Sequence, residues 1–436
     1  MKKSLFALAA LGAVSGVAHA DVTLYGILDA GIVQMTNAGN ISPNFVTGAV
    51  PTGGPYNKIG TTVGMMNGGE SQTRWGIRGS EDLGNGNKAF FQLESAINLG
   101  SGTLGTSGLA GAGCVAGSKT CTFANGSAAQ NANAMVADTS LNGQLFGRNA
   151  YVGLSNHDLG ALTLGRQNSL QLDVITATGG GYDPVNAQMF SPINFSGFYG
   201  GGGETDNARV DSAVKYANKF GNVNVNVLYG FGGMANSSSA RSNVQANIGY
   251  EADRFGVQLT SQVAKDTTGI NPNPNPNTVN VTFVDLTSYM ATLRYRVIDP
   301  LTLRAGYERV EISAPSNPAA DLTMSQIYGY TIGNPGTGSL YNDAQKNINV
   351  YWIGGNYEFS QAWKLSVGYY DAETPAWGTH GSGTDKYISA LVDYNLSKRT
   401  NLYAGWMQDK KSGTSLAYPS SIDTYQTYGI GIRHKF

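Results

Sequence analysis

The chain has 436 residues, a formal net charge of −1 and only 13% charged residues. A balance so close to neutral excludes the strongly basic surface that nucleic-acid-binding proteins use. Beyond residue 20, no stretch approaches the ~18 continuous apolar residues that a membrane-spanning helix needs. A membrane protein of this composition would have to be a closed β-barrel, because only helices and closed barrels satisfy every backbone polar group in lipid.

Residues 1–20 have the features of a secretory signal peptide. Lys2 and Lys3 form a positive amino-terminal region, a short apolar segment follows over residues 4–18, and Ala18-His19-Ala20 is a small-x-small cleavage site. Such a segment is removed on export. We therefore expect one mature domain, residues 21–436.

Beyond the signal segment, apolar and polar residues alternate with a period of two, the pattern of strands with two different faces. In residues 209–216, this alternation places Arg209 and Val210 on opposite faces, and residues 363–370 and 427–436 follow the same pattern. In a transmembrane barrel the apolar face of each strand contacts lipid and the polar face lines a wet lumen.

The only two cysteines, Cys114 and Cys121, lie close together in a stretch rich in Gly and Ser. In an exported protein, two nearby cysteines without neighbouring histidines favour a disulfide over a metal site. We expect this disulfide to stabilise a loop.

The lengths of the connections alternate along the whole chain. Short connections, dense in the residues that tight turns need, lie at residues 81–87, 156–160, 219–222, 251–254, 298–300, 359–361 and 396–399. Long stretches lie between them, at residues 37–69, 100–143, 169–207, 234–240, 265–283, 313–346, 373–384 and 410–422. In the fifth of these, the Asn-Pro repeat of residues 271–277 is incompatible with a strand interior.

Seven short turns and eight long loops connect sixteen strands. An all-β chain with an even number of antiparallel strands, short turns at one end and long loops at the other, is typical of transmembrane barrels. Aromatic residues near the strand ends would form the girdles at the two lipid interfaces. They are Tyr25, Trp75, Tyr151, Tyr229, Tyr307, Trp352, Tyr369, Tyr394, Trp406 and Tyr428.

Several segments, in order along the chain, resemble the trimeric general porins of Gram-negative bacteria, of the β-proteobacterial type. Residues 21–31 (DVTLYGILDAG) are similar to the family's first strand, and residues 74–84 (RWGIRGSEDLG) and 89–94 (AFFQLE) to the second and third. Residues 148–154 (RNAYVGL) and 164–167 (LGRQ) resemble the strands on either side of the second turn. The carboxyl-terminal Phe436 is the last residue that the family's assembly signal requires.

This resemblance implies a multi-pass outer-membrane channel for passive diffusion of small hydrophilic solutes and ions. It implies a homotrimer that contacts membrane lipid and lipopolysaccharide and is inserted by the barrel-assembly machinery. It also implies that the third long loop, residues 169–207, folds into the lumen and narrows the pore. No cofactor or metal is expected.

The resemblance further implies a row of basic residues on the wall opposite this loop: Arg74, Arg148 and Arg209, with Arg78 on the same face as Arg74. Alternation supports Arg74 and Arg209 if Trp75 and Val210 face lipid. For Arg148 alternation is ambiguous, and the family match then places Tyr151 outward. Arg166 would lie near the constriction, although alternation groups it with Leu162 and Leu164.

The third loop departs from the family's pattern. Related loops carry a Pro-Glu-Phe-Gly segment, whereas residues 191–197 read SPINFSG and contain no acid. The acids that remain in the loop are Asp173, Asp183, Glu204 and Asp206. Without the usual glutamate, the arginines favour a preference for anions.

Two other classes of function fit less well. An enzyme with a Ser-His-Asp set would need a suitable histidine, and the mature chain offers His157 in a turn, His380 in a loop and His434 near the end, with no Gly-x-Ser-x-Gly motif. A secreted adhesin would show internal repeats, and none is evident. A sugar-specific channel with an aromatic path through its pore stays open as an alternative.

Overall fold

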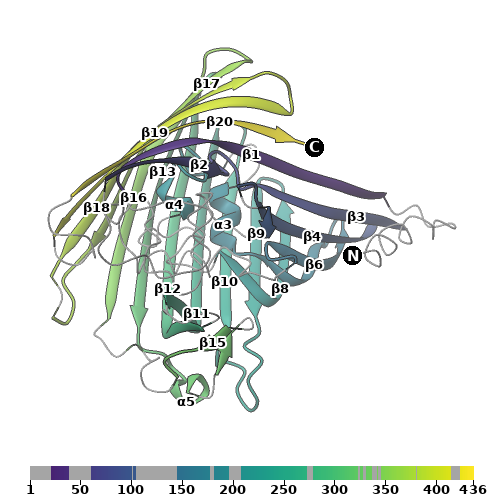
Figure 1. Cartoon of the computed structure of the whole chain (residues 1–436). Coiled ribbons are helices and arrows are strands. Elements are labelled where there is room, and N and C mark those ends of the chain that lie inside the picture. Colours follow the sequence, from purple (N-terminus) through teal and green to yellow (C-terminus); the bar gives the residue numbers. More distant parts are fainter. Residues whose placement is uncertain are drawn as a thin grey trace.

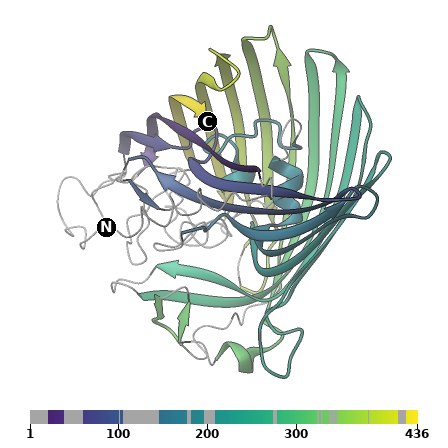
Figure 2. The same cartoon turned by 90° about the vertical axis from the view of Figure 1, so that its right-hand side faces the viewer.

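The computed structural model describes residues 21–38, 60–100, 102–104, 145–176, 181–195, 208–272, 278–322, 325–327, 330–335, 341, 345–379, 381–413 and 423–436. These residues form a closed antiparallel β-barrel of sixteen strands, as the alternating connections predict (Figures 1 and 2). No helix in the described part of the chain is long and apolar enough to cross a membrane.

In the described residues the wall consists of seventeen strands in sixteen positions, because β2 and β3 share one position; otherwise each strand pairs with its neighbours in chain order. They are β1 (Asp21–Ala38), β2 (Gly60–Asn67), β3 (Arg74–Gly84), β4 (Asn87–Asn98), β6 (Asn149–Asn156), β7 (Gly160–Asn168), β8 (Arg209–Phe220), β9 (Val223–Gly230), β10 (Asn243–Glu251), β11 (Phe255–Pro272), β12 (Thr278–Ile298), β13 (Leu301–Ser313), β16 (Lys346–Glu358), β17 (Trp363–Thr374), β18 (Gly383–Asn395), β19 (Thr400–Gly413) and β20 (Thr424–Lys435). Shorter elements lie in the connections: β5 (Thr103–Leu104), β14 (Gln326–Ile327), β15 (Tyr330–Ile332), α3 (Leu170–Thr176), α4 (Pro192–Phe195) and α5 (Pro318–Asp321).

The second position in the wall is divided between two strands. β1 pairs with β3 over its first part, where Leu24 lies opposite Ile77, and with β2 over its second part, where Gly31 lies opposite Met66. Residues 68–73 connect β2 to β3, and we call this segment the strand break. The barrel closes where β20 pairs with β1, with Ile32 opposite Ile430.

All seven predicted short turns connect neighbouring strands, and long connections lie at the other end. The fifth long connection is an exception. β11 continues through Pro272 and β12 resumes at Thr278, so most of residues 265–283 is strand and not loop. Pro272 takes a strand position because it is the last residue of β11, where a missing N–H donor does not interrupt the ladder.

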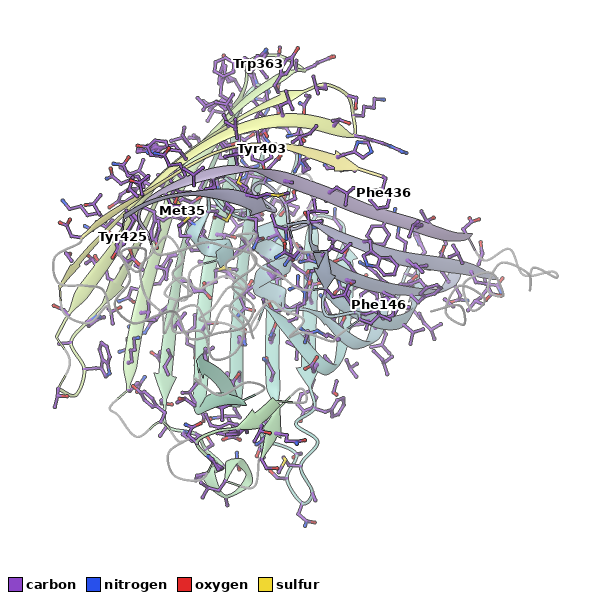
Figure 3. The ribbon with its side chains drawn as sticks, viewed as in Figure 1. Met35, Phe146, Trp363, Tyr403, Tyr425 and Phe436 are labelled. Atoms are coloured by element: carbon purple, nitrogen blue, oxygen red, sulfur yellow. The ribbon has the colours of Figure 1, made fainter. Side chains whose placement is uncertain are left out.

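The outer surface is apolar, as the alternation predicts. In β17, Trp363, Val367 and Tyr369 are exposed whereas Ser366 and Tyr370 are buried, and Trp363 lies at the turn end of the wall (Figure 3). In β20, Ile430 is exposed and Thr427 is buried. Leu and Ile side chains on this surface suit contact with lipid hydrocarbon.

Four predicted orientations are wrong. Tyr25, Tyr151 and Trp352 point into the barrel and not toward lipid: Tyr25 bonds Glu94, Tyr151 bonds Gln92, and Trp352 is only 2% exposed. Val210 is also inside, packed with Leu170. Its orientation follows from Ser212, whose φ of 48° marks an irregularity in β8 that shifts the alternation.

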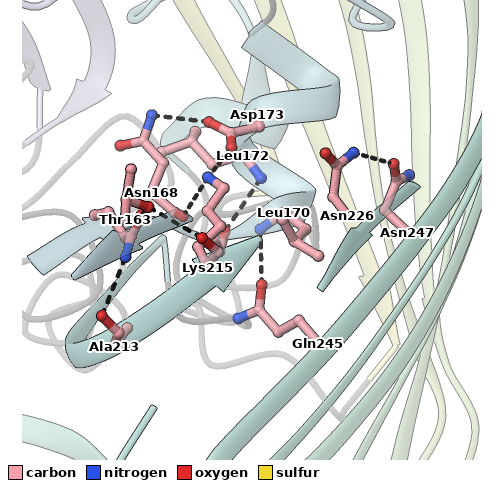
Figure 4. Close-up of polar contacts among 12 residues, drawn as sticks. Thr163, Asn168, Leu170, Leu172, Asp173, Ala213, Lys215, Asn226, Gln245 and Asn247 are labelled. Atoms are coloured by element: carbon pink, nitrogen blue, oxygen red, sulfur yellow. Dashed lines mark hydrogen bonds and ion pairs between the residues drawn. The ribbon is translucent and has the colours of Figure 1, made fainter. Parts of the chain in front are cut away.

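Loop 3 denotes residues 169–207, and its described parts, residues 169–176 and 181–195, lie in the lumen, where Figure 1 shows α3 and α4 inside the barrel. Helix α3 begins after Ser169, whose hydroxyl accepts a hydrogen bond from the Leu172 N–H at 3.2 Å, an N-cap. On one side the Leu170 N–H donates to Gln245 Oε1 at 2.7 Å (Figure 4). On the other side Trp352 Nε1 donates to the Tyr182 carbonyl at 3.0 Å.

The strand break supports the middle of this loop. The N–H groups of Gln188 and Met189 donate to the carbonyls of Glu70 and Gly69, at 3.1 and 3.0 Å. The loop therefore contacts opposite parts of the wall through fixed hydrogen bonds, which positions it across the lumen.

Candidate functional site

A water-accessible cavity of about 910 Å³ lies in the lumen between loop 3 and the wall. Among the described residues, eight basic side chains line it: Arg74, Arg78, Arg148, Arg209, Arg304, Lys364, Arg433 and Lys435. Five carboxylates also line it: Glu70, Glu94, Asp173, Asp183 and Glu358. We call it the constriction cavity, and its lining carries more positive than negative charge.

Glu94 organises the basic side of this cavity. Its carboxylate accepts a hydrogen bond from Arg148 Nε at 2.6 Å and lies 3.4 Å from Arg74 Nε. The Tyr25 hydroxyl donates to the same carboxylate at 3.0 Å. Glu94 is only 4% exposed, so its contacts with the arginines are poorly screened by water.

Three of the four firmly predicted arginines, Arg74, Arg148 and Arg209, come together at this carboxylate. Arg209 lines the cavity and interacts electrostatically with Glu94. Arg78 also lines the cavity, with its guanidinium 5.0 Å from the centre of the Tyr25 ring.

Arg148 reaches Glu94 although Tyr151 also points inward. β6 begins at Asn149, and Arg148 lies in the bend that precedes it, so strand alternation does not apply to Arg148. Arg166 lies apart from the cavity lining. It donates to Asp211 at 2.6 Å and to the Gly147 carbonyl at 2.6 Å.

Further charges line the cavity near the strand break and on β13. Arg433 forms an ion pair with Glu70 at 2.7 Å and donates to the Ser71 hydroxyl at 2.8 Å. Lys364 forms an ion pair with Asp393 at 2.8 Å. Arg304 Nε donates to the Gly181 carbonyl of loop 3 at 2.6 Å.

The described acids of loop 3 are already engaged. Asp173 forms an ion pair with Lys215 (Figure 4). Asp183 is 1% exposed and accepts hydrogen bonds from the hydroxyls of Ser191 and Tyr370. Burial raises the pKa of the Asp183 carboxyl.

Glu204, Asp206, Cys114, Cys121 and residues 1–20 lie outside the described residues. Phe436 lies at the barrel seam, where its N–H and carbonyl bond the carbonyl and N–H of Gly26, both at 3.1 Å. In the part of the chain that the structure describes, no group of three His, Cys, Asp or Glu side chains could hold a metal ion.

Sequence reasoning missed Glu94, Glu70 and Arg304 as site residues. For Glu94 the signal was available, because Gln92 and Glu94 alternate with Phe91 and Leu93 in β4. Lys364, Arg433 and Lys435 also fall on polar faces of their strands. Glu70 could not be found this way, because it lies in the strand break, where the alternation is interrupted.

A barrel with an apolar exterior and a hydrated, charged lumen is a transmembrane channel. The chain belongs to the Gram-negative porin family, whose sequence pattern matches residues 7–414. It is an outer-membrane channel that crosses the membrane with its strands and lets small hydrophilic solutes diffuse passively.

Individual proteins are similar to this chain over all or nearly all of its length. An outer membrane porin protein of Bordetella pertussis is 27% identical over 465 residues, which cover 100% of both chains. The solved anion-selective porin from Comamonas acidovorans superposes with a TM-score of 0.61 and 18% identity, covering 96% of this chain and 100% of that one. The trimer form of OmpT, an outer membrane protein of Vibrio cholerae, gives a TM-score of 0.55 and 16% identity, covering 96% of this chain and 99% of that one.

Proposed function

We propose that this porin passes small anions in preference to cations, and that the arginines around Glu94 set the preference. The observation that carries the proposal is the local charge at Glu94, where one carboxylate faces Arg74, Arg148 and Arg209. The surplus positive charge lies in a narrow, poorly screened part of the lumen. A fixed charge in such a place raises the local concentration of counter-ions.

Two further observations support an anion preference. Basic side chains outnumber carboxylates around the constriction cavity, and one of those carboxylates, Asp183, is buried against Tyr370. A solved structure with the same fold is an anion-selective porin.

The test is the zero-current potential of single channels in a salt gradient. Replacing both Arg74 and Arg209 by Ala should shift the permeability ratio toward cations by about thirtyfold, because each of the two removed charges changes the local ion energy by about 1 kcal/mol. Conductance should rise as the passage widens. Arg254→Ala removes a 60% exposed arginine at a short turn and serves as the matched control, with no expected change.

An unchanged potential in a folded, conducting double variant would mean that these arginines do not control selectivity. A wild-type channel that prefers cations would contradict the sign of the preference.

We further propose that the functional unit is a homotrimer of separate pores embedded among outer-membrane lipid and lipopolysaccharide. The apolar outer surface of the terminal strands, including Ile32 and Ile430, supports it, as does the trimer form recorded for the Vibrio cholerae protein. Native mass measurement in mild detergent should give three copies. A monomer under the mildest conditions would argue against it.

Two proposals concern maturation of the chain. Residues 1–20 are removed as a signal peptide, so intact-mass measurement should give a mature chain starting at Asp21, the first residue of β1. Cys114 and Cys121 form a disulfide in the second long loop, so thiol labelling of the native, non-reduced protein should find no reactive cysteine. Two labelled thiols per chain would end the second proposal.

Phe436 is the proposed signal for the barrel-assembly machinery. Its side chain is 40% exposed at the seam, on the outer surface. Phe436→Ala should lower the yield of assembled barrel in cells more than it lowers refolding of purified chain in detergent. Equal losses in the two measurements would point to a role in stability alone.

A further inference from the structure

A second cavity, of about 440 Å³, lies between helix α3 and the wall formed by β8 to β12. We call it the α3 cavity. It shares only Asp173 with the lining of the constriction cavity. Glu251 and Lys219, which lie next to short turns, belong to its lining, so it faces the periplasmic end of the barrel.

The wall of this cavity is a group of amide side chains on three neighbouring strands. Asn226 Nδ2 donates to Asn247 Oδ1 at 2.8 Å, across a pair of facing residues in β9 and β10 (Figure 4). Asn224 and Gln258 exchange two hydrogen bonds, at 3.0 and 3.2 Å. These bonds fix the orientation of each amide in advance.

Gly249 makes the exchange between Asn224 and Gln258 possible. It lies opposite Asn224 on one side and Gln258 on the other. A Cβ at this position would come within 1.9 Å of Gln258 Oε1. Glycine therefore leaves the space through which the Gln258 amide reaches across β10.

Of the five charged side chains that the structure describes around the α3 cavity, four form two ion pairs, and the fifth, Lys219, lies next to a short turn. Arg294 pairs with Glu251 at 2.5 Å, and Lys215 pairs with Asp173. This arrangement contrasts with the surplus of arginines in the constriction cavity. An amide-lined surface whose neighbouring charges are mostly paired suits hydroxyl groups, because an amide offers both donors and acceptors.

The opposite side of the α3 cavity is apolar. Leu170 and Val174 of α3 line it, together with Ala217 of β8. A pocket with an apolar side and a few fixed polar groups is the usual form of a small-molecule site, and its volume is in the range of such sites.

We propose that the α3 cavity binds a small neutral polyhydroxylated solute of monosaccharide size on the periplasmic side of the constriction. The hydroxyl groups bond the free positions of the amides, and the C–H face of the solute packs on Leu170 and Val174. Among these amides, Asn226 is best able to bind a hydroxyl group. Its one side-chain hydrogen bond uses a donor, which leaves its carbonyl oxygen to accept from a hydroxyl. This site is independent of the charge preference proposed for the constriction.

The experiment uses D-glucose as the probe and saturation-transfer NMR on the purified wild-type protein in detergent. A saturable signal is expected. Asn226→Leu and Gln258→Met keep side-chain size and remove amide groups, and each should weaken binding about fivefold, because at least one hydrogen bond is lost. Asn218→Leu is the matched control. It removes an exposed amide next to the short turn of residues 219–222, outside the lining of the α3 cavity, and should bind glucose as wild type does.

Asn247 keeps its hydrogen bond from Asn224 at 2.9 Å when Asn226 is replaced, so the wall should stay folded. If Asn226→Leu fails to fold, Asn226→Ser replaces it as the variant. Absence of a saturable signal from the wild type would overturn the proposal. Equal binding by wild type and both amide variants would also overturn it, because glucose would then bind elsewhere.

Discussion

At the scale of single residues, one buried acid organises the constriction. Glu94 contacts Arg148, Arg74 and Tyr25, which come from three different parts of the chain. Truncating such an acid would leave the arginines facing one another with less neutralising charge. The carboxylate therefore both positions the basic groups and moderates their field.

Glu94→Gln is predicted to increase the preference for anions, because it removes a negative charge from the narrow part of the lumen. Glu358→Gln removes the same charge from an exposed position of the same cavity and serves as the matched control. The shift in zero-current potential should be larger for Glu94→Gln, since screening by water is weaker around a buried group. Equal shifts in the two variants would show that the burial of the carboxylate does not determine its effect on ion selectivity.

Sequence reasoning predicted which arginines lie together better than it predicted the contacts that hold them. Arg74, Arg148 and Arg209 come together as the family resemblance implies, whereas alternation alone could not place Arg148, which precedes its strand. Arg166 stays apart because Asp211 holds its guanidinium. A partner on a neighbouring strand, 45 residues away, cannot be read from local spacing.

At the scale of elements, the structure of loop 3 depends on contacts with distant strands. Its backbone carbonyls bond Arg304 of β13, Trp352 of β16 and Ser389 of β18. Polar contacts with β10 hold α3 on the other side. These contacts fix the loop on both sides, so the constriction should be stable and not open by movement of the whole loop.

Asp183 of loop 3 should make the stability of the folded barrel depend on pH. Its folded-state pKa is raised above its ordinary value of 3.8 by burial, so the folded protein binds more protons than the unfolded chain. The protonated Asp183 carboxyl therefore contributes to folding stability at pH values below 3.8, and this contribution is lost as the pH rises through the folded-state pKa. Asp183→Asn should remove this pH-dependent contribution to stability.

The measurement is the temperature at which the folded band is lost on gels, for wild type and Asp183→Asn at several pH values from acid to neutral. The difference between the two proteins should change with pH in favour of the variant as the pH rises. Asp211→Asn changes an acid on the barrel wall with a 43% exposed side chain and is the control. A constant difference between wild type and Asp183→Asn would contradict the assignment.

The sequence predicts the hairpins well because both strands of each hairpin and their short turn are local. It predicts interruptions poorly. The irregularity at Ser212, the strand break and the continuation of β11 to Pro272 each depend on the neighbouring strand or on loop 3. Such contacts leave no periodic pattern in the chain.

At the scale of the whole molecule, Asp29 joins the seam of the barrel to the constriction. Its carboxylate accepts hydrogen bonds from the N–H groups of Gly69, Glu70 and Ser71 at 3.1, 3.0 and 2.6 Å, and from the Tyr403 hydroxyl at 2.6 Å. One side chain of β1 thus fixes the strand break and β19.

Asp29→Ala is predicted to destabilise the folded barrel by about 3 kcal/mol or more, because it leaves several buried donors without a partner. The temperature of loss of the folded band should fall by several degrees. Asp158→Ala, at an exposed short turn, is the control. A variant as stable as wild type would show that water replaces the carboxylate without cost.

The contacts between Asp29 and Tyr403 and between Glu70 and Asn401 join residues 374 and 331 positions apart in the chain. Contacts of such high sequence separation form late, because the entropy of closing a long loop opposes them until the intervening hairpins are in place. Before they form, β1 and β20 are open strand edges that could pair with other chains. The strand break therefore acquires its partners on β19 and β20, Asn401 and Arg433, only at the last step of folding, so a chain that has not closed has neither a sealed wall nor a finished constriction.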